Sequence, residues 1–348
     1  MRRTKTTLVG AAIAVISVLT ALSAGPAQSA SARAEDKGTI PAVSAKYGSL
    51  APGRSAPPKI IGSPSDQRVL NLPPEILWHN TSNNETQIWH MDDNRISSRQ
   101  GLVEEDGSLT HVGPPWQIVG VADFGGRTNM DVLWHNASTN ETQIWYMNGY
   151  RIDERRSVLE EGGSPTHVGA PWEIAGTADF DQSGSPDILW HNTSTNETQI
   201  WYMFGNSIRS RRSVLEEGGS PTHVGAPWEI AGVAGVNPYG GTDIFWHNTR
   251  TNETQIWYMN GNSRIAARRR VLEESGSPTH VGAPWEIAGT ADFDQHGSPD
   301  ILWHNTSTNE TQIWYMNGNR IDERRDVLEQ GGSPTRFGTP WQIAGIGD

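Results

Sequence analysis

Two short segments carry carboxylates at alternate positions beside a glycine, a pattern that can supply ligands to a hard metal ion. The first segment, from Asp179 to Asp187, reads DFDQSGSPD, and the second, from Asp292 to Asp300, reads DFDQHGSPD. Calcium prefers oxygen ligands, and glycine permits the tight turn that brings alternate carboxylates together. A plain hairpin turn is the alternative interpretation of both segments.

A histidine recurs in the phrase Trp-His-Asn, at His79, His135, His191, His247 and His304. Five equivalent ligands match tetrahedral or octahedral coordination poorly, so a metal centre is not expected there. We expect these histidines to be structural, with satisfied hydrogen bonds beside the tryptophan. Adjacent acids such as Glu160-Glu161 and Glu216-Glu217 are expected to be solvated strand ends.

Catalytic chemistry finds no support in the sequence, which contains no Gly-x-Ser-x-Gly, no His-Glu-x-x-His, no cysteine and no phosphate-binding loop. An active site needs an asymmetric group of residues, whereas nearly every polar residue here recurs in several copies. We therefore expect a binding protein rather than an enzyme. The net charge of −12 argues against nucleic acid and anionic lipid as partners.

The chain is organised by a repeat of tryptophans, which occur as five sets of three. The Trp-His-Asn tryptophans recur at intervals of 56 or 57 residues, at Trp78, Trp134, Trp190, Trp246 and Trp303. A second tryptophan follows each of them in Gln-Ile-Trp, and a third closes each copy in Pro-Trp-x-Ile. A fixed period of this length indicates one supersecondary unit stacked on copies of itself.

Each repeat contains four strand-like segments separated by turn residues, which in one copy are 172–179, 187–192, 197–203 and 208–216. Four strands in five copies predict an all-β fold, a five-bladed β-propeller of four-stranded blades over residues 71–348. The first copy lacks a Trp-x-Ile strand, and the chain ends with a spare one from Trp341 to Gly345. We therefore expect the C-terminal strand to complete the first blade and close the ring. A solenoid, the alternative, would need distinct capping repeats.

The N-terminal seventy residues differ in composition from the repeats. A basic start and an apolar run from Leu8 to Leu22 predict a secretory signal peptide over residues 1–32, and hence a secreted, extracellular protein. Residues 33–70 are rich in Ala, Ser, Gly and Pro, which predicts a flexible N-terminal tail. This tail is either a linker or a recognition segment, whose side chains available to a partner include Ile40, Val43, Lys46 and Tyr47.

The two acidic segments resemble the FG-GAP and VCBS repeats of integrin-type propellers, in which Asp-x-Asp-x-Asp-Gly-x-x-Asp binds calcium. For the first segment, the resemblance implies calcium ligands at Asp179, Asp181, Ser183 and Asp187. For the second it implies Asp292, Asp294 and Asp300, with His296 standing in place of an oxygen ligand. The pattern fails in two other copies, because one keeps a single early acid, Asp123, and residues 235–239 keep none.

The leader, the tail and five Trp-His-Asn repeats without a further domain resemble the propeller adaptor of Streptomyces umbrella toxin particles. In that family the adaptor is not an enzyme, and it joins the repeats of a large toxin to a trypsin-like subunit that bears a lectin domain. Its N-terminal segment enters the trypsin-like cleft, which implies a contact within residues 33–70, with Lys37, Lys46 or Arg54 as basic anchors. The alternative function is a multivalent carbohydrate-binding lectin, in which Trp, Asn, Gln and Glu of each repeat bind sugar.

Overall fold

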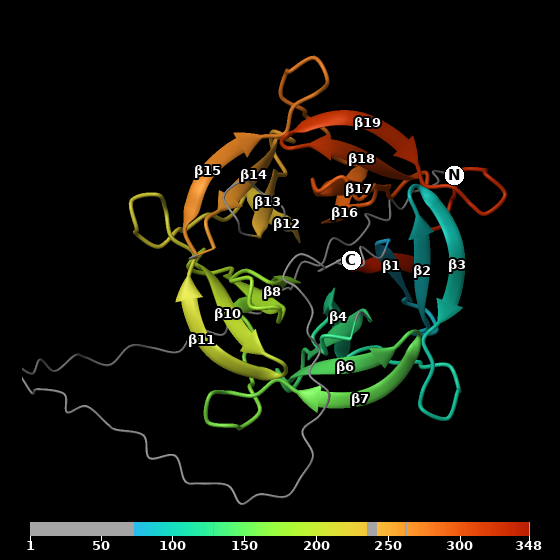
Figure 1. Cartoon of the computed structure of the whole chain (residues 1–348), viewed down its shortest axis with the longest axis vertical. Coiled ribbons are helices and arrows are strands. Elements are labelled where there is room, and N and C mark those ends of the chain that lie inside the picture. Colours follow the sequence, from blue (N-terminus) through green and yellow to red (C-terminus); the bar gives the residue numbers. More distant parts are fainter. Residues whose placement is uncertain (1–72, 128, 235–241, 262, 348) are drawn as a thin grey trace, which may run out of the picture. The chain divides into compact units, whose positions relative to one another are not determined.

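The computed structural model describes residues 73–347, except for 128, 235–241 and 262. Within these residues, twenty strands form five four-stranded antiparallel sheets, which stand around a common axis as the blades of a propeller (Figure 1). The predicted five-bladed β-propeller fold is therefore confirmed. The predicted signal peptide and tail lie outside the described residues.

Each blade has an inner, a second, a third and an outer strand. For blades 1 to 5 in turn, the inner strands are β20 (Trp341–Gly347), β4 (Trp116–Ala122), β8 (Trp172–Ala178), β12 (Trp228–Ala234) and β16 (Trp285–Ala291). The second strands are β1 (Glu75–Asn80), β5 (Asp131–Asn136), β9 (Asp187–Asn192), β13 (Asp243–Asn248) and β17 (Asp300–Asn305).

The third strands, in the same order, are β2 (Thr86–Asp92), β6 (Thr142–Asn148), β10 (Thr198–Phe204), β14 (Thr254–Met259) and β18 (Thr311–Asn317). The outer strands are β3 (Arg95–Gly101), β7 (Arg151–Ser157), β11 (Ser207–Ser213), β15 (Ile265–Arg270) and β19 (Arg320–Asp326). Because neighbouring strands are antiparallel, the loops from inner to second strands and the turns from third to outer strands lie on one face of the ring. We call this face the loop face.

The hydrophobic core lies between adjacent blades, because the second and third strands carry apolar side chains on both of their faces. Leu133 and Ile144 of blade 2, for example, pack in one cluster with Ile188, Trp190 and Trp201 of blade 3. Four similar clusters fill the other junctions. Each blade therefore depends on both of its neighbours for burial. The outer strands are charged and largely exposed, which discourages strand addition at the sheet edges.

The C-terminal strand closes the ring, as the sequence predicts. β20 pairs antiparallel with β1, with Trp341 opposite Asn80. Neighbouring inner strands also approach so closely that a glycine is needed at the contact: a Cβ on Gly232 of β12 would lie 2.8 Å from Oγ1 of Thr290 in β16. Equivalent close approaches recur at the other four junctions, from Gly120, Gly176, Gly289 and Gly345.

An arginine of each outer strand links neighbouring blades at the rim. Its guanidinium lies 4.0–4.3 Å from the ring centroid of a tryptophan in its own blade. It also pairs, at 2.6–2.7 Å, with a glutamate that follows the outer strand of the preceding blade, as Arg99–Glu329, Arg155–Glu104, Arg211–Glu160, Arg268–Glu216 and Arg324–Glu273. The expectation of solvated strand ends is therefore wrong for Glu160 and Glu216, because their partners come from the next repeat.

The Trp-His-Asn phrase is structural in every blade. Nδ1 of each histidine lies 2.9–3.0 Å from a threonine hydroxyl of the third strand. The asparagine caps the next turn, since Asn192 Oδ1 accepts the backbone N–H groups of Ser194 and Thr195 at 3.0 and 2.9 Å. Burial lowers the pKa of all five histidines, which keeps them neutral. The structural interpretation of these histidines is confirmed.

Candidate functional site

The loop between β8 and β9 brings three carboxylates together on the loop face. Oxygen atoms of Asp179, Asp181 and Asp187 all lie within 4.8 Å of one another. Asp179 accepts the backbone N–H groups of Ser183 and Gly184 at 3.0 and 2.7 Å, and these bonds shape the turn. Ser183, the fourth predicted ligand, is exposed on the same turn. The structure therefore gathers the predicted residues of this segment.

The loop between β16 and β17 repeats this arrangement with one change. Oxygen atoms of Asp292, Asp294 and Asp300 again lie within 4.8 Å of one another. The backbone N–H of His296 donates to Asp292 at 3.0 Å, and its ring Nδ1 lies 2.8 Å from Asp294 Oδ2. This contact raises the pKa of His296. His296 thus pairs with a candidate ligand rather than adding an oxygen to the group.

The third acid of each loop has a structural role of its own. Asp187 Oδ1 and Asp300 Oδ1 each accept the backbone N–H of a methionine in the third strand, both at 2.8 Å. Asp131 of blade 2 makes the same bond, also at 2.8 Å, and its Oδ2 accepts the N–H of Gly125. Among the described residues, Asp131 does not belong to a cluster of three acids like those that contain Asp187 and Asp300. This carboxylate therefore recurs with or without neighbouring acids.

The electrostatics of both loops favour a counter-charge. Burial raises the pKa of Asp187 to about 7 and that of Asp300 to about 8, and the nearby loop aspartates contribute in the same direction. Burial also raises the pKa of Asp179 and Asp292. A bound divalent cation would stabilise the ionised carboxylates, and hard oxygen donors are the ligands such an ion takes. The two clusters thus fit a hard metal ion.

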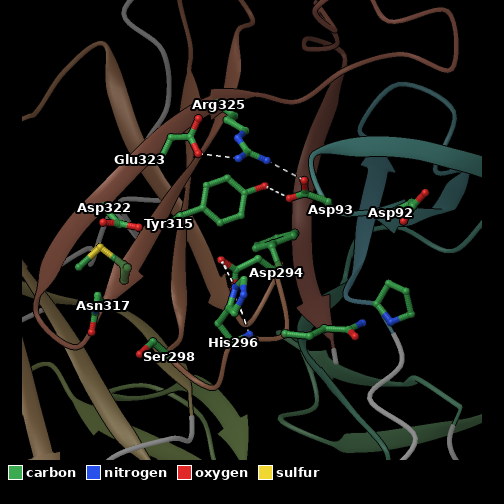
Figure 2. A pocket seen from close by; sticks show the side chains of 14 residues that line it. Asp92, Asp93, Asp294, His296, Ser298, Tyr315, Asn317, Asp322, Glu323 and Arg325 are labelled. Atoms are coloured by element: carbon green, nitrogen blue, oxygen red, sulfur yellow. Dashed lines mark hydrogen bonds and ion pairs between the residues drawn. The ribbon is translucent and has the colours of Figure 1, made fainter.

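A cavity of about 610 Å³ lies beside the second acidic loop, between blade 5 and blade 1 (Figure 2). Asp93, in the turn between β2 and β3, accepts a hydrogen bond from the Tyr315 hydroxyl. Arg325 donates to Asp93 at 2.8 Å and to Glu323 at 2.5 Å. Sequence reasoning missed this network, because its members come from opposite ends of the propeller sequence.

Two of the three tryptophans in each repeat are inaccessible to a sugar ring. The Trp-His-Asn and Gln-Ile-Trp tryptophans are at most 4% exposed. The Pro-Trp-x-Ile tryptophans, at the start of each inner strand, are half-buried. Stacking on a sugar needs an exposed ring face, so the lectin alternative loses most of its proposed aromatic contacts.

Two other aromatic side chains are exposed on the loop face. Phe204, the last residue of β10, is 73% exposed, and Tyr150, in the turn between β6 and β7, is 44% exposed. Other copies have asparagine or aspartate at both positions. The asparagine that replaces Tyr150 in blade 3, Asn206, donates to the backbone of blade 2 at 2.8 Å. A tyrosine has no side-chain amide to donate this inter-blade hydrogen bond, so at Tyr150 an exposed ring takes the place of the bonded amide.

The predicted tail contacts fall within residues 1–72, so the structure does not place them. They are Lys37, Ile40, Val43, Lys46, Tyr47 and Arg54, and all six lie outside the described residues. In the part of the chain that the structure covers, no helix is long and apolar enough to cross a membrane.

The sequence matches no known family profile and no curated protein. Several solved structures are similar to this chain. A structure of the nidogen/laminin complex is 14% identical, with 79% of this chain and 97% of that one covered and a TM-score of 0.43. The Tc holotoxin pore of Photorhabdus luminescens is 13% identical, with coverages of 69% and 11% and a TM-score of 0.40.

A luciferin-regenerating enzyme is 10% identical, with 77% of this chain and 81% of that one covered and a TM-score of 0.39. At such low identities and TM-scores, these neighbours carry no argument about activity or partners. The function must therefore be argued from the residues of this chain.

Proposed function

We propose that the protein is a secreted, non-enzymatic interaction adaptor. It links a large repeat-containing toxin to a trypsin-like subunit with a lectin domain, through the propeller surface and the N-terminal tail. The sequence resemblance described above supports this choice of partners. The propeller fold is compatible with an interaction role, because a closed ring offers a rigid surface on which single side chains can vary.

The observation that carries the proposal is the exposure of Phe204 and Tyr150 on the loop face. Neither ring is required by the architecture, since the sister copies fold with asparagine or aspartate there. Exposed aromatic side chains are the residues that most often dominate the energetics of protein interfaces. Among the residues that the structure describes, exposed aromatic side chains of this kind occur in blades 2 and 3 alone, which suits a partner that binds one side of the ring rather than five equivalent sites.

Replacement by the sister residues tests this surface. We expect Phe204→Asn and Tyr150→Asn to weaken capture of the toxin by the tagged protein at least about tenfold. Leu109→Ala is the matched control, because Leu109 is 46% exposed in the linker after β3, outside the loop face. Undiminished capture by the double variant would contradict the role of this surface. A sugar resin in parallel tests the lectin alternative.

The tail is tested separately. We expect deletion of residues 33–70 to abolish binding of the trypsin-like subunit and to leave the melting temperature of the propeller unchanged. An extended segment gains main-chain hydrogen bonds in such a cleft, and a basic side chain can fill an acidic pocket. Lys46→Glu is the sharper variant, with Lys37→Glu and Arg54→Glu as competing anchors. Full binding by the isolated propeller would exclude the tail contact.

The proposal also includes calcium ions bound in the two acidic loops. A calcium ion held by Asp179, Asp181 and Asp187 would fix the loop between β8 and β9, and one held by Asp292, Asp294 and Asp300 would do so in blade 5. Its role would be structural, and the loop of blade 3 lies beside Phe204, because Ser185 of that loop accepts the backbone N–H of Gly205 at 3.2 Å. The ordered carboxylates and the raised pKa of Asp187 and Asp300 support this assignment.

A further inference from the structure

A second cavity, of about 580 Å³, lies where the outer part of blade 3 meets blade 4. Its polar walls include Arg212, Ser263 and Arg264, and its apolar wall is formed by Leu215 and Pro221. The volume falls within the range of small-molecule sites. None of the described residues that line this cavity is acidic, in contrast to the cavity beside the second acidic loop.

An inserted residue distinguishes this junction from the other four. The turn of blade 4 is one residue longer than its sisters, since five residues separate Met259 from Ile265 whereas four separate Met203 from Ile208. This insertion accounts for the single interval of 57 residues. Ser263 lies in the lengthened turn at a φ of 53°, is 3% exposed, and its carbonyl accepts the N–H of Leu215 at 2.7 Å. Ser263 and Arg264, the last two residues of this turn, therefore form part of the cavity wall.

Arg212 lacks the acidic partners that its counterparts in blades 2 and 5 have. Arg325, the counterpart of Arg212 in blade 5, is held between Glu323 and Asp93 (Figure 2). Arg156 of blade 2 likewise pairs with a glutamate two residues before it, at 2.6 Å. In blade 3 that position is Ser210.

The partner from the adjacent blade is missing as well, because the counterpart of Asp93 in blade 4 is Gly261. Among the residues that the structure describes, no carboxylate lies within 4.0 Å of the guanidinium of Arg212 or Arg264. Two arginines therefore line one cavity without an ion-pair partner among the described residues.

We propose that this cavity binds a small ligand with one oxyanion group, a carboxylate, phosphate or sulfate. The guanidinium groups of Arg212 and Arg264 would pair with the oxyanion, because their planar donors match its geometry. Leu215 and Pro221 would contact an apolar part of the ligand. The ligand is small because residues 71–348 hold 36 acidic residues against 18 arginines and no lysine, a balance that repels large acidic partners. This site is independent of the adaptor role.

The test titrates the full secreted chain with benzoate, phenyl phosphate and phenyl sulfate, measured by calorimetry at low ionic strength. The three probes share an apolar ring and differ in the oxyanion, so they identify the preferred group. Ser210→Glu gives Arg212 the partner that sister copies have, and Arg212→Gln introduces the residue that blade 1 carries as Gln100. Both variants use side chains that the fold already accepts at these positions.

We expect saturable binding of at least one probe to the wild type, weakened at least about tenfold by either variant. Arg269→Gln is the matched control, because Arg269 is the exposed blade 4 counterpart of Arg212 and does not line this cavity. It should leave the affinity unchanged. The proposal is overturned if no probe saturates at millimolar concentration, or if Arg269→Gln weakens binding as much as Arg212→Gln does. Unchanged circular dichroism and melting temperature verify that each variant is folded.

Discussion

His304 of blade 5 packs edge-on against Trp78 of blade 1, with ring centroids 5.7 Å apart. The same contact joins His79 to Trp134, and it recurs at the other three junctions, with centroid distances between 5.8 and 6.3 Å. The junction between the last and the first blade is therefore built like the other four. This equivalence makes the ring a single cooperative unit, and the stability of any blade depends on closure.

Truncation before Trp341 is expected to unfold more than the first blade. It removes β20, and with it Trp341, Ile343 and Ile346, which pack against the cluster between blades 5 and 1. We predict a loss of more than about 5 kcal/mol in the free energy of unfolding, because several large apolar side chains are lost together. Chemical denaturation measures it. A truncated chain that unfolds at the same denaturant concentration as the full chain would exclude closure by β20.

The close approach of the inner strands predicts a position-specific response to a single methyl group. In Gly232→Ala the new Cβ would lie 2.8 Å from Thr290 Oγ1, so neighbouring strands must shift. We expect a destabilisation of about 1–3 kcal/mol, the usual effect of overpacking. Gly218→Ala is the control, since no atom lies within 4 Å of its Cβ position, and its effect should stay within about 0.5 kcal/mol. Equal effects of both changes on thermal melting would refute tight inner packing.

Calcium is expected to raise the melting temperature, because an ion that binds the folded state alone stabilises it, by about 2.7 kcal/mol at a hundredfold excess over Kd. Asp181→Ala should remove part of this response and Asp294→Ala another part. Asp153→Ala, an exposed acid outside both loops, serves as the control. Identical melting curves in calcium and in chelator would leave both loops as plain hairpin turns.

In the presence of chelator, stability is expected to fall as the pH rises from about 6.5 to about 8. The pKa values of Asp187 and Asp300 are about 7 and about 8 in the folded protein, above the ordinary value for aspartate. The folded state therefore holds protons in this range that the unfolded state has released, and a rise in pH disfavours it by up to about 1.4 kcal/mol per unit and group.

Calcium should flatten this dependence, since the cation stabilises the ionised carboxylates. The window avoids the five Trp-His-Asn histidines, whose lowered pKa values act below about pH 6.5 and in the opposite sense. Denaturation midpoints across the pH range provide the measurement. Stability that is constant or rising in chelator would show that the aspartates titrate near their ordinary pKa.

The architecture was predictable because the repeat fixes it. The five copies of the tryptophan repeat predict the number of blades, and strand β9 at Asp187–Asn192 matches the predicted segment. The outer strand β11 ends at Ser213 rather than at the predicted residue 216. Beyond Ser213 the chain changes partners, since Leu215 pairs with Pro221 of its own hairpin and with Arg264 of the next blade, and Glu216 pairs with Arg268. A pattern within one repeat does not reveal a partner some fifty residues away.

The candidate sites were predictable to different degrees. Both acidic loops could be identified because their ligands are contiguous in the sequence, and the structure gathers them as expected. The cavity at Arg212 and Arg264 could not be identified from the sequence. It combines residues of two blades, and its character depends on which acidic residues do not lie near these arginines. Its one signal in the sequence was the interval of 57 residues, which reveals an insertion but not its place.

Co-purification of the tagged full-length protein from its native culture medium, with quantitative mass spectrometry of the eluate, tests the adaptor proposal most directly. We predict that a large repeat-containing protein and a trypsin-like protein elute with it in constant ratios. The trypsin-like protein should be lost on deletion of residues 33–70, and the large protein on the combined Phe204→Asn and Tyr150→Asn change. Elution of the wild type without either protein would contradict the adaptor function.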